Sequence, residues 1–301
     1  MISAAGLTKV YGGKTALDHA DFAVRPGVVT GFLGPNGAGK STAMRLILGL
    51  DRATSGSVTV NGRAYRDLPA PLREVGALLE AKAWHGGRSA YDHLRFLART
   101  NGIPKSRVGE VLDIVGLSDV SGKRAKGYSL GMGQRLGIAA ALLGDPGTLM
   151  FDEPVNGLDP EGILWIRRLM QSLAAEGRTV FVSSHLMSEM AVTAGHLIVI
   201  GRGRILADTS MNDFIAANAT SHVRVRSPER QALGRVIAGQ DWRAAATDDG
   251  SILVYGVTPA DVGDLLHQAG LRVHELASVQ PSLEEAFMRL TADSIEFHGG
   301  G

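Results

Sequence analysis

The stretch of this sequence that decides the fold is Gly34-Pro35-Asn36-Gly37-Ala38-Gly39-Lys40-Ser41-Thr42. It follows a mostly apolar run at residues 28–33 and precedes a second apolar segment at residues 44–48. This order predicts a strand, a glycine-rich loop and a helix. In that setting the pattern G-x-x-x-x-G-K-[ST] is typical of a phosphate-binding loop, because the N–H groups and the dipole of a helix N-terminus both favour an anion.

Each part of this loop has an expected task. Gly34, Gly37 and Gly39 let the backbone wrap closely around a phosphate. We expect Lys40 to reach the β and γ phosphates of a nucleotide and the Ser41 hydroxyl to hold Mg²⁺. The whole of residues 34–42 is therefore predicted to bind a nucleotide. The alternative, a glycine-rich turn that carries Lys-Ser-Thr without a ligand, is disfavoured by the flanking strand and helix.

The composition fits an ordinary globular protein of two domains: 301 residues, 45% hydrophobic and 20% charged. The formal net charge of +1 gives no electrostatic reason to expect nucleic acid or an anionic membrane as a partner. Cysteine is absent, which excludes disulfides, thiolate metal sites and a cysteine nucleophile. No signal peptide and no apolar run near the ~18 residues of a membrane span is visible, so we expect the chain to stay in the cytosol.

Two further strand ends carry polar side chains. The strand predicted at residues 148–151 is followed by Asp152 and Glu153. A carboxylate there is costly unless a cation meets it, so Asp152 is expected to bind Mg²⁺. Glu153 is expected to point the other way along the strand and to polarise the water that attacks the γ phosphate; a helix-capping acidic turn is the alternative. His185 follows the strand predicted at residues 179–182 and is expected to contact the γ phosphate.

Two loop residues have weaker signals. Tyr11 is expected in the loop between strands at residues 2–7 and 16–24, where its ring can stack on adenine or simply pack. Asp159 is expected to cap a helix whose first residue is Pro160. Residues 85–144 show helical spacing and read as a helical insertion in an α/β core.

Together these features resemble the nucleotide-binding subunit of an ATP-binding cassette (ABC) transporter over residues 1 to about 217. The motifs that carry the resemblance are Tyr11, the phosphate loop, Glu80, Tyr128-Ser129-Leu130-Gly131-Met132-Gly133-Gln134-Arg135, Asp152-Glu153, Gly157-Leu158-Asp159 and His185. The fold it implies is a P-loop NTPase core of the ABC ATPase type, with an antiparallel β layer and a helical subdomain at about residues 85–144.

The resemblance also implies a dimer. Ser129, Gly131 and Met132 belong to the signature loop, which in this family completes the ATP site of a second subunit, and Tyr11 and Asp159 are expected among the nucleotide contacts. Two chains would then sandwich two ATP molecules. This sequence departs from the family at three positions: Glu80 replaces the usual glutamine, Leu130 a signature glycine, and Met132 the better-known glutamine. Glu80 thus becomes a second carboxylate expected near Mg²⁺ and the reaction.

The region after residue 217 has a different pattern. Residues 218–291 predict a small accessory domain with the order β-α-β-β-α-β, which is the ferredoxin-like arrangement, and its last strand is expected at residues 271–276. Residues 292–301 are expected to form a flexible tail. The segment at residues 281–291 looks like the end of bacterial ATPases that drive drug or antibiotic efflux.

These features predict an ATP hydrolase with ATP and Mg²⁺ as cofactors. By the resemblance it works as a homodimer on the cytoplasmic side of the cell membrane, bound peripherally to a separate integral-membrane permease that exports a drug, antibiotic or other small compound. No nucleic-acid partner is expected. The alternatives are a soluble ABC ATPase that acts on nucleic acid or ribosomes, a P-loop kinase or GTPase, and a binding module without activity.

Overall fold

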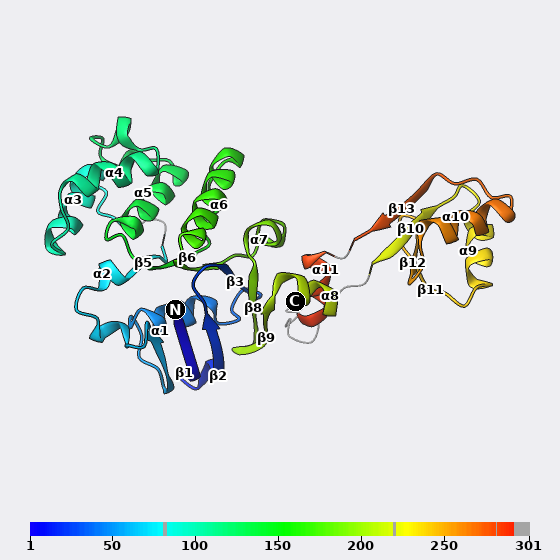
Figure 1. The fold of residues 1–301 in the computed structure, drawn as a ribbon, viewed down its shortest axis with the longest axis horizontal. Helices are drawn as coiled ribbons and strands as arrows, with labels where there is room; N and C mark the ends of the chain where they lie inside the picture. The colour runs from blue at the N-terminus through cyan, green and yellow to red at the C-terminus, as the bar shows by residue number, and fades with distance from the viewer. Residues whose placement is uncertain (81–82, 219–220, 281, 292–301) are drawn as a thin grey trace. The chain divides into compact units, whose positions relative to one another are not determined.

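A computed structural model of the chain describes residues 1–80, 83–218, 221–280 and 282–291 (Figure 1). The chain divides into two compact units, Met1–Met211 and Asn212–Ala292. The tail predicted at residues 292–301 lies outside the described residues.

A six-stranded sheet forms the centre of the first unit. Its strand order is β5-β6-β7-β3-β8-β9, and all neighbours are parallel except β8 and β9. The strands are β3 (Val29–Leu33), β5 (Val75–Leu78), β6 (Thr148–Asp152), β7 (Thr179–Ser183), β8 (His196–Gly201) and β9 (Arg204–Ser210). All residues of β3 and β7 are buried, as expected for central parallel strands. The carboxyl ends of β6, β7 and β3 therefore meet at one edge of the sheet.

A three-stranded antiparallel sheet packs on this core. Its order is β2-β1-β4, with β1 (Ile2–Tyr11), β2 (Lys14–Val24) and β4 (Ser55–Val60). Phe22 of β2 joins Phe32 and Phe181 of the central sheet, with ring centroids 5.1–6.2 Å apart. The predicted loop position of Tyr11 is wrong, because β1 continues past the irregular pairing after Ala4 and ends at Tyr11 itself.

Helices complete the first unit. The region predicted to be helical holds three of them, which lie together in Figure 1 and are held by fully buried Leu94, Val111 and Ile138. The helices are α1 (Lys40–Ile47), α2 (Pro71–Glu74), α3 (Ala90–Thr100), α4 (Ser106–Ile114), α5 (Leu130–Leu142), α6 (Pro160–Ala175) and α7 (Met187–Thr193). Short 3-10 turns lie at Tyr65–Asp67, Ser118–Val120 and Ala125–Gly127.

The second unit contains a four-stranded antiparallel sheet in the order β11-β12-β10-β13. Its chain order β10-α9-β11-β12-α10-β13 is that of the ferredoxin-like arrangement. The last strand lies at residues 275–279 rather than at the predicted 271–276, because the segment after α10 first turns back and the backbone of Leu271 bonds to Leu266. The elements are α8 (Met211–Asn218), β10 (His222–Arg226), α9 (Arg230–Ala238), β11 (Arg243–Ala246), β12 (Ile252–Tyr255), α10 (Pro259–Gln268), β13 (Glu275–Val279) and α11 (Leu283–Thr291).

Candidate active site

The glycine-rich loop joins β3 to α1 and ends at Gly39, the N-cap of α1. Gly39 has φ 112°, and a Cβ atom there would lie 2.6 Å from the backbone oxygen of Ala16. Glycine is therefore required by both conformation and space. The next residue, Lys40, is buried, and its Nζ donates to the carbonyl oxygens of Gly34 (2.6 Å) and Pro35 (3.2 Å).

Burial and nearby charges have opposite effects on the pKa of Lys40. Burial lowers the pKa of its ammonium group, and the charges of Glu153 and Asp152 partly offset that effect. A cation held in this way, with only neutral carbonyl partners, is suited to exchange them for the oxygens of a phosphate.

Asp152 is the last residue of β6 and faces the first turn of α1. Its Oδ2 accepts a hydrogen bond of 2.8 Å from Ser41 Oγ, and its Oδ1 accepts one from Ser183 Oγ at the end of β7. Asp152 and Ser183 are register partners in the parallel pair β6–β7. The sheet therefore places the carboxylate beside the phosphate loop, with both of its oxygens oriented by hydroxyl groups.

Glu153 lies beyond the end of β6 in a left-handed conformation, with φ 51°. Its Oε2 lies 2.7 Å from Nδ1 of His185 and accepts a longer bond of 3.3 Å from the His185 backbone N–H. The predicted opposite orientation along a strand does not apply to Glu153, because the strand ends one residue earlier and the chain turns there. The pairing with His185 instead orients the carboxylate.

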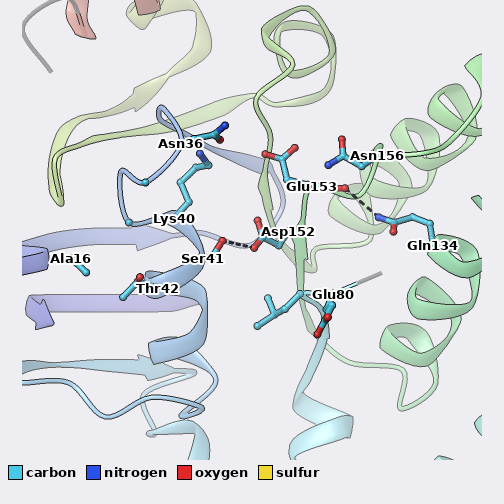
Figure 2. A pocket seen from close by; sticks show the side chains of 13 residues that line it. Ala16, Asn36, Lys40, Ser41, Thr42, Glu80, Gln134, Asp152, Glu153 and Asn156 are labelled. Carbon is cyan, nitrogen blue, oxygen red and sulfur yellow. Dashed lines mark hydrogen bonds between the residues drawn. The ribbon is translucent and has the colours of Figure 1, made fainter. Parts of the chain in front are cut away.

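One cavity of about 460 Å³ brings the central residues together. Figure 2 shows Ser41 facing Asp152, Lys40 beside Asn36, and Glu80 and Glu153 at different sides of the same space. The volume of this cavity is in the range of small-molecule binding sites. The lining residues are Ala16, Asn36, Gly37, Gly39, Lys40, Ser41, Thr42, Leu79, Glu80, Gln134, Asp152, Glu153 and Asn156.

Comparison with known proteins identifies the family. Residues 17–156 match the family model of the ABC transporter. An uncharacterized ABC transporter ATP-binding protein, YhcH of Bacillus subtilis (strain 168), is 36% identical over 96% of this chain and 95% of its own length. The chain belongs to the ABC transporter ATP-binding proteins. It is thus an ATP-binding subunit with the ATP hydrolase core of this family.

Two other relatives carry names that state what they transport. The bacitracin transport ATP-binding protein BcrA of Bacillus licheniformis is 36% identical over 96% of this chain and 97% of that protein. The lantibiotic transport ATP-binding protein SrtF of Streptococcus pyogenes is 39% identical over 69% of this chain and 90% of that protein. Residues 221–284 match a domain of unknown function, DUF8746.

Solved structures show the same fold. A structure described as the ATP-binding subunit of an ABC transporter gives a TM-score of 0.67 at 26% identity, over 72% of this chain and 92% of the other. The dimeric, post-hydrolysis structure of the ATP-binding cassette MJ0796 with ADP and Pi gives a TM-score of 0.64 at 22% identity, over 70% of this chain and 99% of the other.

Several residues predicted for the site of this ABC subunit lie outside the cavity lining. Tyr11 is half exposed; its hydroxyl donates to Asp51 Oδ2 at 2.7 Å, and Lys9 Nζ lies 4.6 Å from its ring centre. Ser129 caps α5 by accepting from the Met132 N–H at 3.2 Å, and Asp159 caps α6. The others that do not line it are Gly34, Pro35, Ala38, Gly131, Met132 and His185.

The structure adds five residues to the predicted site. The cavity is also lined by Ala16, Leu79, Gln134 and Asn156, and Ser183 orients Asp152. A hydroxyl at the end of β7 could have been inferred from the same strand-end argument that selected His185. Gln134 belongs to the signature motif, but its place beside Glu153 of its own chain depends on how α5 packs on β5 and meets the loop after β6.

The donor set around Ser41 suits Mg²⁺, because a hydroxyl and carboxylates are the hard oxygen ligands this ion prefers. Ser41 and Asp152 already touch, and Glu80 lines the same cavity. Among the described residues there is no group of three or more His, Cys, Asp or Glu side chains arranged to hold a metal.

Proposed function

We propose that the chain binds Mg²⁺-ATP at the phosphate loop and hydrolyses it with Glu153 as the base that activates water. The observation that supports this most strongly is the single cavity lined by Lys40, Ser41, Asp152 and Glu153. Lys40 would bind the β and γ phosphates, while Ser41 and Asp152, with Glu80 nearby, would hold Mg²⁺, which supplies charge neutralisation at the phosphates. His185 would orient Glu153 and contact the γ phosphate. Glu153 would take the proton of the attacking water at its carboxylate.

We also propose that two copies of the chain share each nucleotide. Ser129 lies exposed at the N-terminus of α5, and neither it nor Gly131 or Met132 lines the cavity of its own chain. A helix N-terminus with an exposed hydroxyl is suited to an anion. The γ phosphate held by a second copy would supply that anion. Tyr11 would stack on adenine and Asp159 would lie near the shared nucleotide, as the family resemblance implies.

The names of the relatives suggest the process that hydrolysis drives. We propose export of a drug, antibiotic or other small compound through a separate integral-membrane permease, with the chain on the cytoplasmic side of the membrane. In the part of the chain that the structure describes, no helix has both the length and the apolar character of a membrane span. The alternative, a soluble ABC ATPase acting on nucleic acid or ribosomes, has no support in the near-zero net charge.

We propose that the permease binds at a second cavity. This cavity has a volume of about 550 Å³, a mostly apolar lining that includes Trp84 and Leu97, and a rim at Leu50, which is 56% exposed. Ser41, Leu79, Glu80 and Asp152 line both cavities. An amphipathic segment of the permease bound there would bury this apolar surface and touch the wall of the nucleotide site.

Two experiments test these proposals. Glu153→Gln is expected to bind ATP with wild-type affinity but to lose at least about 100-fold in turnover, the usual contribution of a general base. Near-normal hydrolysis would remove Glu153 from this role. For the partner, purification of the chain from its native membranes in mild detergent should recover a multi-span protein, and Leu50→Asp should reduce that recovery without changing ATP affinity. Recovery of a soluble homodimer whose turnover is stimulated by nucleic acid would favour the alternative.

A further inference from the structure

Gln134 connects the signature helix to the catalytic loop of the same chain. Its side chain is 1% exposed, and its Nε2 donates to the backbone carbonyl oxygen of Glu153 at 3.2 Å (Figure 2). Gln134 lies on α5, the helix that Ser129 caps, five residues after that cap. We propose that Gln134 is a positioning residue for Glu153 and thereby links the two ATP sites of the dimer. This inference rests on the roles proposed above for Glu153 and for a second copy of the chain.

The backbone of Glu153 needs external support. A residue other than glycine with φ 51° adopts a sparsely populated conformation, which persists only when its surroundings hold it. The N–H of Glu153 donates to the backbone oxygen (3.2 Å) and to Oγ (3.1 Å) of Ser183. Its carbonyl oxygen accepts from the N–H of Asn156 at 3.2 Å and from Gln134. Gln134 is thus the side chain from outside this loop that holds the carbonyl end of the Glu153 peptide.

The chemistry of Gln134 argues against a role in packing alone. Its amide must turn Nε2 toward Glu153, because a carbonyl oxygen can only accept a hydrogen bond. This leaves Oε1 buried without a partner among the described residues. A buried acceptor without a donor costs free energy that an apolar side chain of similar size would not. The buried amide is therefore better explained by the hydrogen bond that its Nε2 donates to Glu153 than by packing.

A second contact joins the same two segments. Gly157, with φ 77°, lies against Leu130: a Cβ atom at Gly157 would come within 2.3 Å of Leu130 Cδ2. The start of α5 therefore fits against the turn that follows Glu153. Leu130, at a position where the family usually has glycine, contacts this turn of its own chain.

Together the two contacts give a physical route between sites. When Ser129 and Gly131 engage the nucleotide of a second copy, any shift of α5 acts on Glu153 through Gln134 and on the following turn through Leu130. Hydrolysis at the phosphate loop of one chain would then depend on whether the signature loop of that chain is engaged. Gln134 should affect the chemical step and the cooperativity between sites, but not the affinity of the phosphate loop for ATP.

Gln134→Met tests this, because methionine keeps the length and removes the donor. The matched control is Gln171→Met on α6, where Gln171 Nε2 likewise donates to a backbone oxygen, that of Val192 at 3.0 Å, away from the cavity. Measurements are the ATP dissociation constant, kcat, KM, the Hill coefficient for ATP and the thermal midpoint. We expect Gln134→Met to lower kcat about fivefold, as the loss of one ordinary hydrogen bond predicts, with a Hill coefficient closer to one and unchanged ATP affinity. Gln171→Met should keep wild-type kcat.

Three results would overturn the proposal: an unchanged kcat in Gln134→Met, an unchanged Hill coefficient, or an equal loss of kcat in both variants in step with the thermal midpoint. If Gln134→Met does not fold, Gln134→Leu also removes the N–H donors without adding a charge to the cavity, with the same expectations. A wild-type chain without ATPase activity would instead refute the proposed function, so the two failures are distinguishable.

Discussion

Replacing Lys40 with methionine removes the charge at the centre of the proposed phosphate site while keeping most of the side-chain volume. Lys40 Nζ donates to two carbonyl oxygens, those of Gly34 and Pro35, so binding to a phosphate would have to replace these bonds. A hydrogen bond to a charged group contributes about 1.5–3 kcal/mol, which corresponds to about 10- to 150-fold in affinity. Because the exchange loses the carbonyl contacts, we expect the lower part of this range, roughly 10- to 30-fold weaker binding.

The assay is isothermal titration calorimetry with ATP and Mg²⁺, with Lys105→Met as the control. Lys105 is exposed and lies next to α4, outside the cavity. The thermal midpoint of Lys40→Met should not fall, because the variant no longer has to bury a cation. An ATP affinity within twofold of wild type, in a folded Lys40→Met chain, would refute the assignment of Lys40 to the phosphates.

Three other predictions concern the Mg²⁺ ligand Asp152, the stacking of Tyr11 on the adenine of ATP, and the second unit. Asp152→Asn should raise the Mg²⁺ concentration needed for half-maximal hydrolysis at least about tenfold, as measured by metal titration, because a charged ligand is lost; an unchanged titration would exclude Asp152 as a ligand. Tyr11→Ala should weaken ATP binding about tenfold but leave inorganic triphosphate binding unchanged in calorimetry, since only ATP has a base to stack; an equal loss for both ligands would contradict stacking. Asp249 accepts hydrogen bonds from Ser251 and Thr247 that hold its pKa well below the unfolded value of 3.8. Its stabilising contribution is therefore present above about pH 4 and is lost as the pH falls toward the lower folded pKa. Asp249→Asn should make the free energy of unfolding less dependent on pH in this range. The measurement is urea unfolding followed by Trp242 fluorescence, with the other two tryptophans replaced by phenylalanine, and an unchanged pH dependence would contradict the prediction.

The central part of the site could be predicted from sequence because local signals place it. The phosphate loop follows from its glycine spacing between a strand and a helix, and Asp152 follows from its place at the end of an apolar strand. Parallel strands bring their carboxyl ends to one edge, so His185 could be placed there as well. Strand alternation does not extend to Glu153, because β6 ends at Asp152. The structure shows a left-handed turn there instead.

The rest depended on contacts between distant segments. The strand predicted at residues 2–7 leaves Tyr11 in a loop, yet the pairing of β1 with β2 continues to Tyr11. The last strand is predicted at residues 271–276, but the pairing with β10 starts only at Glu275. The bond from Gln134 to Glu153 joins residues 19 positions apart on different elements. The spacing of apolar residues along the chain does not predict such a contact.

The most direct test of the shared nucleotide site is sedimentation velocity of Glu153→Gln with Mg²⁺ and saturating ATP. The variant should bind ATP without consuming it and sediment as a dimer of the 31.7 kDa chain, returning to monomer when ATP is removed. Adding Ser129→Arg to the same chain should prevent the dimer while leaving ATP bound, because the bulky side chain blocks the signature loop. A Glu153→Gln chain that is saturated with ATP and remains a monomer across micromolar concentrations would contradict the account.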